Sequence, residues 1–292
     1  MIAHRVLRWS RRAAWSLLLL LTLALALALA VAATESGRRW LHRVDGKWLG
    51  ERVMDTLSRV RSVEDWEAAT PLCLGQDYSW LKKGGAPMRI AHALGESGEP
   101  SANTLGAMRR SYQAGFRIFE VDLVLEDGEL RCQHDPGPQA AMVRDGCTFD
   151  TLIAALPADA FLVLDIKTDF LAVGRKIVDR VKNTLDARRV VFQLYQPEDF
   201  ASFAAWQSEA ALPGPIFTAY LSHRRVDYLV GQVRRLGGAV LTLPLERAPA
   251  LSIRPAGLSV FLHPVHDVDA CARALSAGAQ GFYLLNTVRC PS

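Results

Sequence analysis

The strongest constraint on the fold is a repeated alternation of short apolar segments with helical patterns in the last two thirds of this 292-residue chain. The apolar segments are MRIAHAL (88–94), RIFEVDL (117–123), FLVLDIK (161–167), VVFQLY (190–195), PIFTAYL (215–221), AVLTLP (239–244), SVFLHPV (259–265) and GFYLLN (281–286). Near-continuous apolar strands between helices indicate a parallel sheet covered by helices. Eight such units predict an α/β fold of the (β/α)8 barrel type over residues 87–292. An open doubly wound sheet is the alternative, but no GxGxxG motif follows the first strand.

The helical patterns between the strands have recognisable starts and ends. One pattern carries Leu105, Met108 and Tyr112 and stops at Gly115, a residue typical of helix C-termini. A second pattern covers 177–185, and a third follows Asp267 as N-cap and closes near Gly278.

The first 33 residues have the composition of a targeting segment. Four arginines precede a run of 21 uncharged, mainly apolar residues, Ala13–Ala33, and about 20 such residues can span a bilayer. We expect a signal anchor or a cleaved signal peptide, with a buried soluble helix as a third reading. Both targeting readings leave the arginines in the cytoplasm and export the rest to the periplasmic or extracellular side. Residues 34–86 are expected to form a helical linker that packs on the barrel, because Trp48, Val53, Leu57 and Val60 have helical spacing.

Charge and cysteine content narrow the possible partners and the compartment. The net charge of +4 equals the contribution of the four arginines before residue 13, so the remaining chain is close to neutral and offers no nucleic-acid-binding surface. Five cysteines suit an exported domain, and no pair has the CxxC spacing of a metal site. We expect Cys132 and Cys147 to form a disulfide or to remain buried thiols. Cys73–Cys290 is a weaker pairing, which leaves Cys271 as the odd cysteine.

Polar residues follow the apolar stems of the first three strands. The first strand ends at His92, the second carries Glu120 and Asp122, and the third carries Asp165 and Lys167. Residues two apart on a strand share a face, and the carboxyl ends of barrel strands meet at one rim, where active sites lie. Buried carboxylates repel one another, and a divalent cation removes that cost. The pattern therefore predicts an Mg2+ or Ca2+ site at Glu120, Asp122 and Asp165. The alternative is that the acids face solvent or pair with arginine, and that His92 is a core histidine.

A turn at Asp127-Gly128 predicts a hairpin whose returning arm, ELRCQHD, brings His134 within about one residue of Asp122. His92 and His134 would then flank the cation. Two histidines around a cation suit phosphodiester cleavage, because one can take a proton from the nucleophile while the other protonates the leaving oxygen. Lys167 and the cation would offset charge on the phosphoryl group.

The segments IAH, ANTLGAM, AGFRIFEVDLVLEDGELRCQHD and LDIK together resemble the glycerophosphodiester phosphodiesterases, a family in the superfamily of phosphatidylinositol-phospholipase-C-like (β/α)8 phosphodiesterases. The resemblance covers about residues 88–286 and is strongest over 88–167. It implies general acid/base roles for His92 and His134, metal ligation by Glu120, Asp122 and Asp165, and a phosphate contact from Lys167. It also implies hydrolysis of a small-molecule or lipid phosphodiester.

Three positions depart from the family pattern. Ala93 stands where the family has arginine, Ala102 where it has glutamate, and Asp165 where it has a longer glutamate. Two of these features resemble the sphingomyelinase D and phospholipase D toxin branch. A lysophospholipase D-like enzyme that gives a cyclic phosphate is therefore an alternative, as are an inactive phosphate- or lipid-binding barrel and a purely structural envelope protein.

Several further residues are assigned from their place in the pattern alone. His263 ends the seventh strand and is expected to line the pocket, whereas His266 is expected at a helix start. Asn103 is expected to cap the first helix or to touch His92. Gln193, Tyr195 and Tyr283 are expected either to contact substrate or to fill the barrel. His4, His42 and His223 are expected outside the site.

Overall fold

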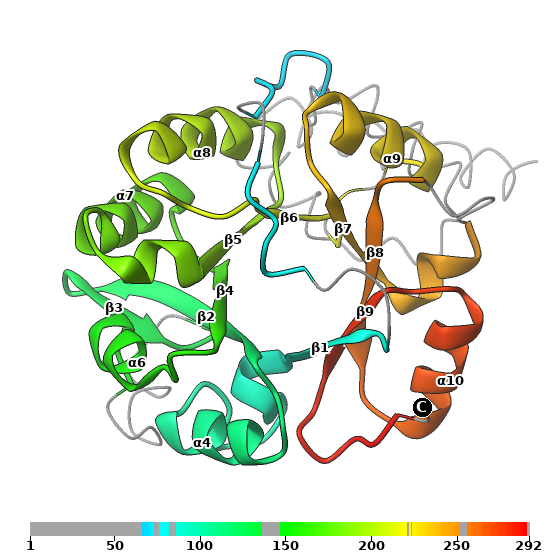
Figure 1. Ribbon diagram of the computed structural model, residues 1–292, viewed down its shortest axis with the longest axis horizontal. Helices are drawn as coiled ribbons and strands as arrows, with labels where there is room; N and C mark the ends of the chain where they lie inside the picture. The colour runs from blue at the N-terminus through cyan, green and yellow to red at the C-terminus, as the bar shows by residue number, and fades with distance from the viewer. Residues whose placement is uncertain are drawn as a thin grey trace, which may run out of the picture. The chain divides into compact units, whose positions relative to one another are not determined.

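In the computed structural model, residues 66–72, 76–81, 86–135, 147–220, 222, 224–250 and 256–290 are described, and eight parallel strands close into a barrel (Figure 1). The strands are β1 (Met88–Ala91), β2 (Ile118–Glu126), β4 (Phe161–Ile166), β5 (Val190–Leu194), β6 (Ile216–Thr218), β7 (Val240–Pro244), β8 (Ser259–Val265) and β9 (Gly281–Leu284). Pairing of β1 with both β9 and β2 completes the ring. The predicted barrel is thus confirmed, and the open sheet is excluded.

Helices form a layer outside the ring (Figure 1). They are α4 (Leu105–Gln113), α6 (Phe149–Ala155), α7 (Phe170–Val181), α8 (Pro197–Glu209), α9 (Val226–Arg235) and α10 (Val268–Ser276), with short 3-10 turns η1 (His92–Gly95), η2 (Leu185–Arg189) and η3 (Leu245–Ala250). Asp267 caps α10 by accepting a hydrogen bond from the backbone N–H of Ala270, as the sequence predicts. Gly115 has a φ of 90° just after α4, which is the left-handed conformation that ends helices.

The short strand β3 (Glu129–Cys132) is the returning arm of a hairpin and lies outside the ring. It pairs antiparallel with the far end of β2, from Leu123 opposite Cys132 to Glu126 opposite Glu129. Asp127 and Gly128 form the two-residue turn with φ angles of 51° and 78°, as the tightest hairpin turns require. The returning arm is therefore part of a hairpin and not a barrel strand, as predicted.

The inside of the barrel changes from apolar to polar along the strands. Its lower part is an apolar cluster of Met88, Ile90, Ile118, Val163, Val191, Ile216, Val240, Phe261 and Tyr283. Two residues further along the same strands, the inward positions carry Glu120, Asp165, Gln193, Thr218, Thr242 and His263. Because residues i and i+2 share a strand face, one apolar layer supports one polar layer at the carboxyl end of the ring.

Segments before the first strand cover the opposite mouth of the barrel. Trp80 packs edge-on against Phe261 in the apolar layer, and its indole N–H donates to the carbonyl of Gly214. Residues 66–72 and 76–81 form turns and extended pieces, so these described parts of the expected linker pack on the barrel without being helical. The helical spacing over 48–60 and the apolar run 13–33 fall outside the described residues. Among the described helices, none is long and apolar enough to cross a bilayer.

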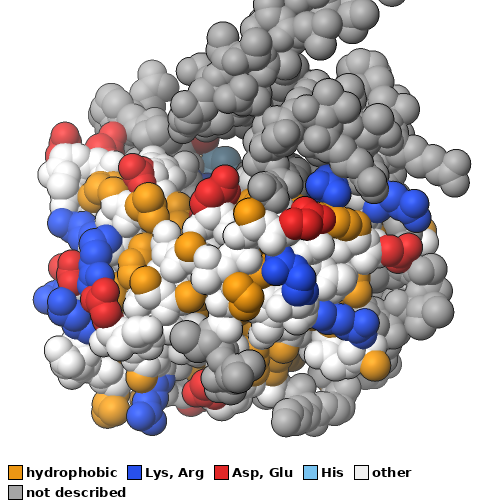
Figure 2. Space-filling model, turned by 90° about the horizontal axis from the view of Figure 1, so that it is seen from above, with side chains coloured by type: hydrophobic (Ala, Val, Ile, Leu, Met, Phe, Trp, Pro, Cys, Tyr) orange, Lys and Arg blue, Asp and Glu red, His pale blue; other side chains and the backbone are white. Residues whose placement is uncertain are grey.

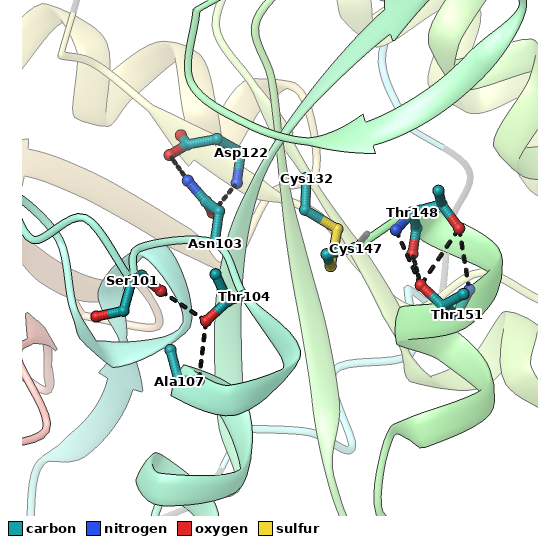
Figure 3. The surroundings of a disulfide bond; sticks show 9 residues. All are labelled: Ser101, Asn103, Thr104, Ala107, Asp122, Cys132, Cys147, Thr148 and Thr151. Carbon is teal, nitrogen blue, oxygen red and sulfur yellow. Dashed lines mark hydrogen bonds between the residues drawn. A yellow bond between two sulfur atoms is a disulfide. The ribbon is translucent and has the colours of Figure 1, made fainter. Parts of the chain in front are cut away.

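Two disulfides tie the ends of elements together. Cys132 at the end of β3 is bonded to Cys147, with a Cα–Cα distance of 5.4 Å, as predicted (Figure 3). Cys271 in α10 is bonded to Cys290, with a Cα–Cα distance of 5.7 Å. This corrects two expectations, that Cys271 is the odd cysteine and that Cys290 pairs with Cys73. The bond joins α10 to the segment after β9.

Charges on the surface are mixed in sign. On the face in Figure 2, Lys and Arg side chains are interspersed with Asp and Glu side chains, and hydrophobic side chains lie singly between them. Many of the surface charges are paired, as in the network of Arg175, Asp179, Lys182 and Glu209. The face in Figure 2 therefore carries no broad field of a single sign.

Candidate functional site

Three carboxylates meet at the carboxyl ends of β2 and β4. Glu120, Asp122 and Asp165 are all buried, and one oxygen from each lies within 4.8 Å of the others. Asp122 and Asp165 are register partners on adjacent strands, while Glu120 lies two residues before Asp122 on the same face. The alternation of the strands alone is enough to build this cluster. The predicted convergence of the three acids is therefore present in the structure.

Lys167 is the cation within this cluster. Its Nζ lies 2.7 Å from Asp165 and 3.0 Å from Asp122, so it forms ion pairs with both aspartates. Although burial opposes its charge, the two aspartates raise the pKa of Lys167. One lysine among three carboxylates leaves the cluster with an excess of negative charge.

The cost of holding a negative charge is greatest at Glu120. Burial, followed by repulsion from Asp122 and Asp165, raises the pKa of the Glu120 carboxyl well above its ordinary value. Burial also raises the pKa of Asp165, whereas for Asp122 the effect of burial is outweighed by Lys167 and by a hydrogen bond from Asn103, which lower its pKa. The cluster is therefore short of positive charge at Glu120.

Asn103 holds Asp122 through two hydrogen bonds (Figure 3). Its Nδ2 donates to Asp122 Oδ2 at 2.7 Å, and its Oδ1 accepts from the backbone N–H of Asp122 at 3.0 Å. The helix cap expected of Asn103 belongs instead to Thr104, which accepts from the N–H of Ala107. Asn103 has a φ of 58°, and this left-handed turn aims its amide at β2 rather than at the helix.

A left-handed turn follows His92 and contacts Glu120. Ala93, Leu94 and Gly95 have φ angles of 49°, 61° and 104°, which are costly for the two residues that are not glycine. The backbone N–H of Ala93 donates to Glu120 Oε2 at 2.7 Å, and the carbonyl of Ala93 accepts from the N–H of Asn103. The strained turn is thus fixed against the acidic cluster, a feature that no sequence pattern predicts.

His92 lies at the rim and contacts His263 from β8, which is separated from β1 only by β9. The two Nε2 atoms are 3.0 Å apart, and the rings meet edge to face with centroids separated by 4.4 Å. Burial lowers the pKa of His92 to about 4 against the opposing charge of Asp122, and burial also lowers the pKa of His263. The neutral form of both rings is therefore favoured.

His134 lies one residue past the position opposite Asp122, within the range that the hairpin register predicts. Because Leu123 pairs with Cys132, the position opposite Asp122 is Gln133, and strand pairing stops before His134. The ring of His134 is 61% exposed, and its Nδ1 lies 3.0 Å from Asp135 Oδ1. It is close enough for its charge to act on both Asp122 and His92. The structure thus puts the two predicted histidines near the cluster, one enclosed and one open to solvent.

The remaining predicted residues lie around the acids and the histidines at different levels. Tyr283 is buried, and its hydroxyl donates to Gln193 Oε1 at 2.9 Å, which favours the barrel-filling alternative over substrate contact. Tyr195 is hydrogen-bonded to Asp165 and so belongs to the shell around the acids. His266 precedes α10 as expected, but its ring centroid lies 6.3 Å from that of His92, a proximity that sequence reasoning missed.

The donor set of the acidic cluster fits a hard divalent cation. All three candidate ligands are carboxylates, which Mg2+ and Ca2+ prefer over nitrogen or sulfur donors. Glu120 Oε1 is buried and has no hydrogen-bond partner in the described part of the chain, so it is an acceptor that only a cation or an additional donor can satisfy. Glu120, Asp122 and Asp165 are therefore the residues that could hold a metal ion.

Comparisons with known proteins point to the same kind of barrel. No known protein family matches the sequence, and no curated protein matches it. Among solved structures, a glycerophosphodiester phosphodiesterase from Thermotoga maritima is 15% identical with a TM-score of 0.55, over 70% of this chain and 96% of that chain. A phosphodiesterase from Oleispira antarctica, solved with the product sn-glycerol-3-phosphate, is 17% identical with a TM-score of 0.55, over 72% of this chain and 95% of that chain.

A glycerophosphodiester phosphodiesterase from Parabacteroides distasonis is also similar, with 17% identity and a TM-score of 0.52 over 68% of this chain and 94% of that chain. The chain shares their fold. The glycerophosphodiester phosphodiesterases named from the sequence are thus confirmed as structural neighbours, while identities this low carry the fold rather than the activity.

Proposed function

We propose that this chain is a metal-dependent phosphodiesterase that hydrolyses glycerophosphodiesters or lipid-derived phosphodiesters. The observation that carries the proposal is the buried cluster of Glu120, Asp122 and Asp165 at the carboxyl rim of the barrel. Structural proteins rarely keep three acids in an enclosed site with one lysine, because mutual repulsion destabilises the fold. A rim cluster in a (β/α)8 barrel is where catalytic groups are expected.

Each residue has a role that follows from its place. Glu120, Asp122 and Asp165 would hold the cation, and a bound divalent cation would supply electrostatic stabilisation of the phosphoryl oxygens. His92 and His134 would exchange protons with the nucleophile and the leaving oxygen, since they approach the cluster from separate elements. Lys167 would stabilise the phosphate, because its Nζ already lies among the acids at the rim.

The substrate class rests on the structural neighbours. Several of them are glycerophosphodiester phosphodiesterases, and the Oleispira antarctica phosphodiesterase was solved with sn-glycerol-3-phosphate. A small head group esterified to glycerol phosphate, free or attached to a single acyl chain, is the corresponding substrate for this chain. We leave the nucleophile as either water or a neighbouring substrate hydroxyl, and the second option gives a cyclic phosphate.

We further propose that the barrel works outside the cytoplasm. The two disulfides support this, because such bonds persist in oxidising compartments and are rare in the cytosol. The sequence of Ala13–Ala33 supports export through a signal anchor or a signal peptide. N-terminal sequencing of the protein from cell envelopes would distinguish these two forms, and a cytoplasmic location would contradict both.

The proposed activity is tested by incubating the purified chain with glycerophosphocholine and lysophosphatidylcholine in Mg2+, Ca2+ or EDTA. Release of choline, glycerol 3-phosphate or a cyclic phosphate identifies the bond that is cleaved and the nucleophile. We expect turnover with a divalent cation and none in EDTA, and a loss of about 100-fold or more for His92→Ala and for His134→Ala.

Asp269→Asn provides a matched control for substitutions of the acids, because Asp269 is an exposed carboxylate in the first turn of α10. Its turnover should equal that of the wild type, whereas Asp165→Asn should abolish cation-dependent turnover. Tight binding of a diester without turnover in any cation would select the inactive binding barrel instead. Wild-type turnover in the two histidine variants would remove the assigned roles.

A further inference from the structure

The contact between His92 and His263 connects the first and the seventh strands of the ring, β1 and β8, which are separated only by β9. His92 follows β1 directly, and His263 lies near the end of β8, so the two rings approach across the rim from positions 171 residues apart. Their Nε2 atoms are 3.0 Å apart, which is hydrogen-bond distance for two ring nitrogens. A pair at this distance must share one proton, because two bare nitrogens or two N–H groups would repel.

The surroundings of the two rings decide which histidine donates. His92 Nδ1 is buried and has no hydrogen-bond partner among the described residues. A buried N–H without an acceptor is rarer in proteins than a buried acceptor without a donor. His92 should therefore leave Nδ1 bare and carry its proton on Nε2, where His263 can accept it. His263 is partly exposed and then carries its own proton on Nδ1, where water can accept it.

Packing below the rings holds this arrangement. The ring of Tyr283 meets His263 edge to face with centroids 5.0 Å apart, and its hydroxyl is fixed by Gln193. On the other side, Tyr220 meets His263 edge to face at 5.5 Å. His263 thus has little freedom to turn away from His92.

We propose that His263 is a positioning residue, which accepts a hydrogen bond from Nε2–H of His92 and thereby fixes both the orientation and the tautomer of that histidine. The inference deepens the proposed function, on which it rests for the importance of His92, but the hydrogen bond itself can be measured without any turnover. The positioning role replaces the expectation from the sequence that His263 lines the substrate pocket.

The tautomer is measured on the full chain, labelled with 15N-histidine and kept in mild detergent and Mg2+, by two-bond proton–nitrogen correlation NMR. The His92 signals are assigned from their disappearance in His92→Gln. In the wild type we expect a protonated Nε2 and a bare Nδ1 on His92. In His263→Phe, which keeps an aromatic ring but removes the acceptor, we expect the His92 nitrogens to average between tautomers.

Kinetics separate positioning from substrate binding. In His263→Phe we expect kcat with glycerophosphocholine to fall about 10- to 100-fold while KM changes less than about twofold, because misplacement of a reacting group mainly affects kcat. His263→Gln should restore most of kcat and the wild-type tautomer, since its amide oxygen can accept from His92. The control Asp269→Asn, at an exposed position of α10, should leave the His92 tautomer and kcat unchanged.

A wild-type His92 that is protonated on Nδ1 overturns the proposal, as does a His263→Phe chain with wild-type His92 signals and kcat. A rise in KM alone would make His263 a substrate contact and would also overturn it. If His263→Phe does not fold, the wild-type spectrum and His263→Gln decide the question. Absence of turnover in the wild type would contradict the proposed function, and the spectra would still test the hydrogen bond.

Discussion

Asn103 controls the orientation of a carboxylate that the sequence alone leaves free to rotate. Its amide is bonded to both the side chain and the backbone N–H of Asp122. Outer groups of this kind set the geometry of metal ligands, and their loss costs about 10- to 100-fold in metal affinity. We therefore expect Asn103→Ala to weaken Mg2+ or Ca2+ binding by that factor, as measured by titration calorimetry.

Asn183→Ala is the matched control for this substitution. Asn183 also has a left-handed backbone, with a φ of 68°, but it is exposed and lies between α7 and the start of β5, at the end of the ring opposite the acids. Both variants replace asparagine at a positive φ, so both carry the same backbone cost. Equal cation affinity in Asn103→Ala and Asn183→Ala would show that Asp122 needs no second partner.

Residues on strands were predictable because strand geometry is simple. The period of two placed Glu120 and Asp122 on one face, and parallel pairing brought Asp165 beside them. Asn103 was singled out, but its contact with Asp122 was missed, because that contact depends on a left-handed turn in a loop, for which asparagine is only one of several signals. The contact of His92 with His263 was missed because it depends on closure of the barrel, which brings together strands that are far apart in the sequence.

At the scale of elements, the hairpin that carries His134 is held by one disulfide. Cys132 lies two residues before His134, and Cys147 anchors it to the start of α6, where Thr148 and Thr151 form a capping box (Figure 3). Removing a crosslink over 15 residues should cost about 3 kcal/mol in the free energy of unfolding. We expect the double variant Cys132→Ser/Cys147→Ser to lose that stability and also about tenfold or more in kcat.

The second disulfide provides the comparison. Cys271 and Cys290 close a similar separation of 19 residues, but they tie α10 to the segment after β9 and not to the hairpin. Cys271→Ser/Cys290→Ser should therefore lose similar stability in urea unfolding while keeping the wild-type kcat under conditions where it is folded. An equal loss of kcat in both double variants would mean that the crosslink at β3 has no special effect on His134.

Glu96 links three elements where the ring closes. It accepts two hydrogen bonds from Arg110 in α4, one from Ser101 and one from Asn286 after β9. The hydrogen bonds from Arg110 dominate and lower the pKa of Glu96 to about 2. The ionised form is therefore favoured in the folded chain.

Because the folded pKa of Glu96 is depressed, its contribution to stability is complete above its ordinary value of 4.5 and is lost as the pH falls toward 2. Urea unfolding of wild type and Glu96→Gln should differ most at pH 7 and converge near pH 2.5. Glu99→Gln, an exposed glutamate three residues away, should match wild type throughout. A difference between wild type and Glu96→Gln that does not depend on pH would exclude a role for the charge.

Elements were predicted well where pattern and length agree. All eight barrel strands and the hairpin were found because each has an apolar stem and a turn signal at its end. The pairing of Cys271 was not, since a helical pattern says nothing about which loop crosses its buried face. Likewise, Trp66 and Trp80 lie in irregular segments whose positions are set by packing rather than by periodicity.

For the whole molecule, the barrel has one polar mouth and one mouth closed by aromatic side chains. Trp80 is 3% exposed and lies against the apolar layer, and Tyr78 donates to the carbonyl of Pro215 while accepting from the N–H of Ala239. We call Tyr78 and Trp80 the aromatic plug. A Cβ on Gly214 would lie 2.4 Å from the ring of Tyr78, so only glycine at position 214 allows this plug to pack against the barrel. The plug therefore stabilises the ring at the end opposite the acids.

This separation predicts that stability and chemistry can be changed independently. Trp80→Ala should lower the free energy of unfolding by about 3–5 kcal/mol, the usual cost of removing a large buried side chain. The kcat of the folded fraction, measured at a temperature below the onset of unfolding, should remain that of wild type, because the apolar layer lies between Trp80 and the polar layer. Trp80→Phe should recover part of the stability by refilling the cavity, whereas Leu185→Ala, at an 83% exposed position, should change neither quantity. A Trp80→Ala chain with unchanged stability but reduced kcat would mean that the two ends of the barrel are coupled, and that the plug belongs to the functional machinery.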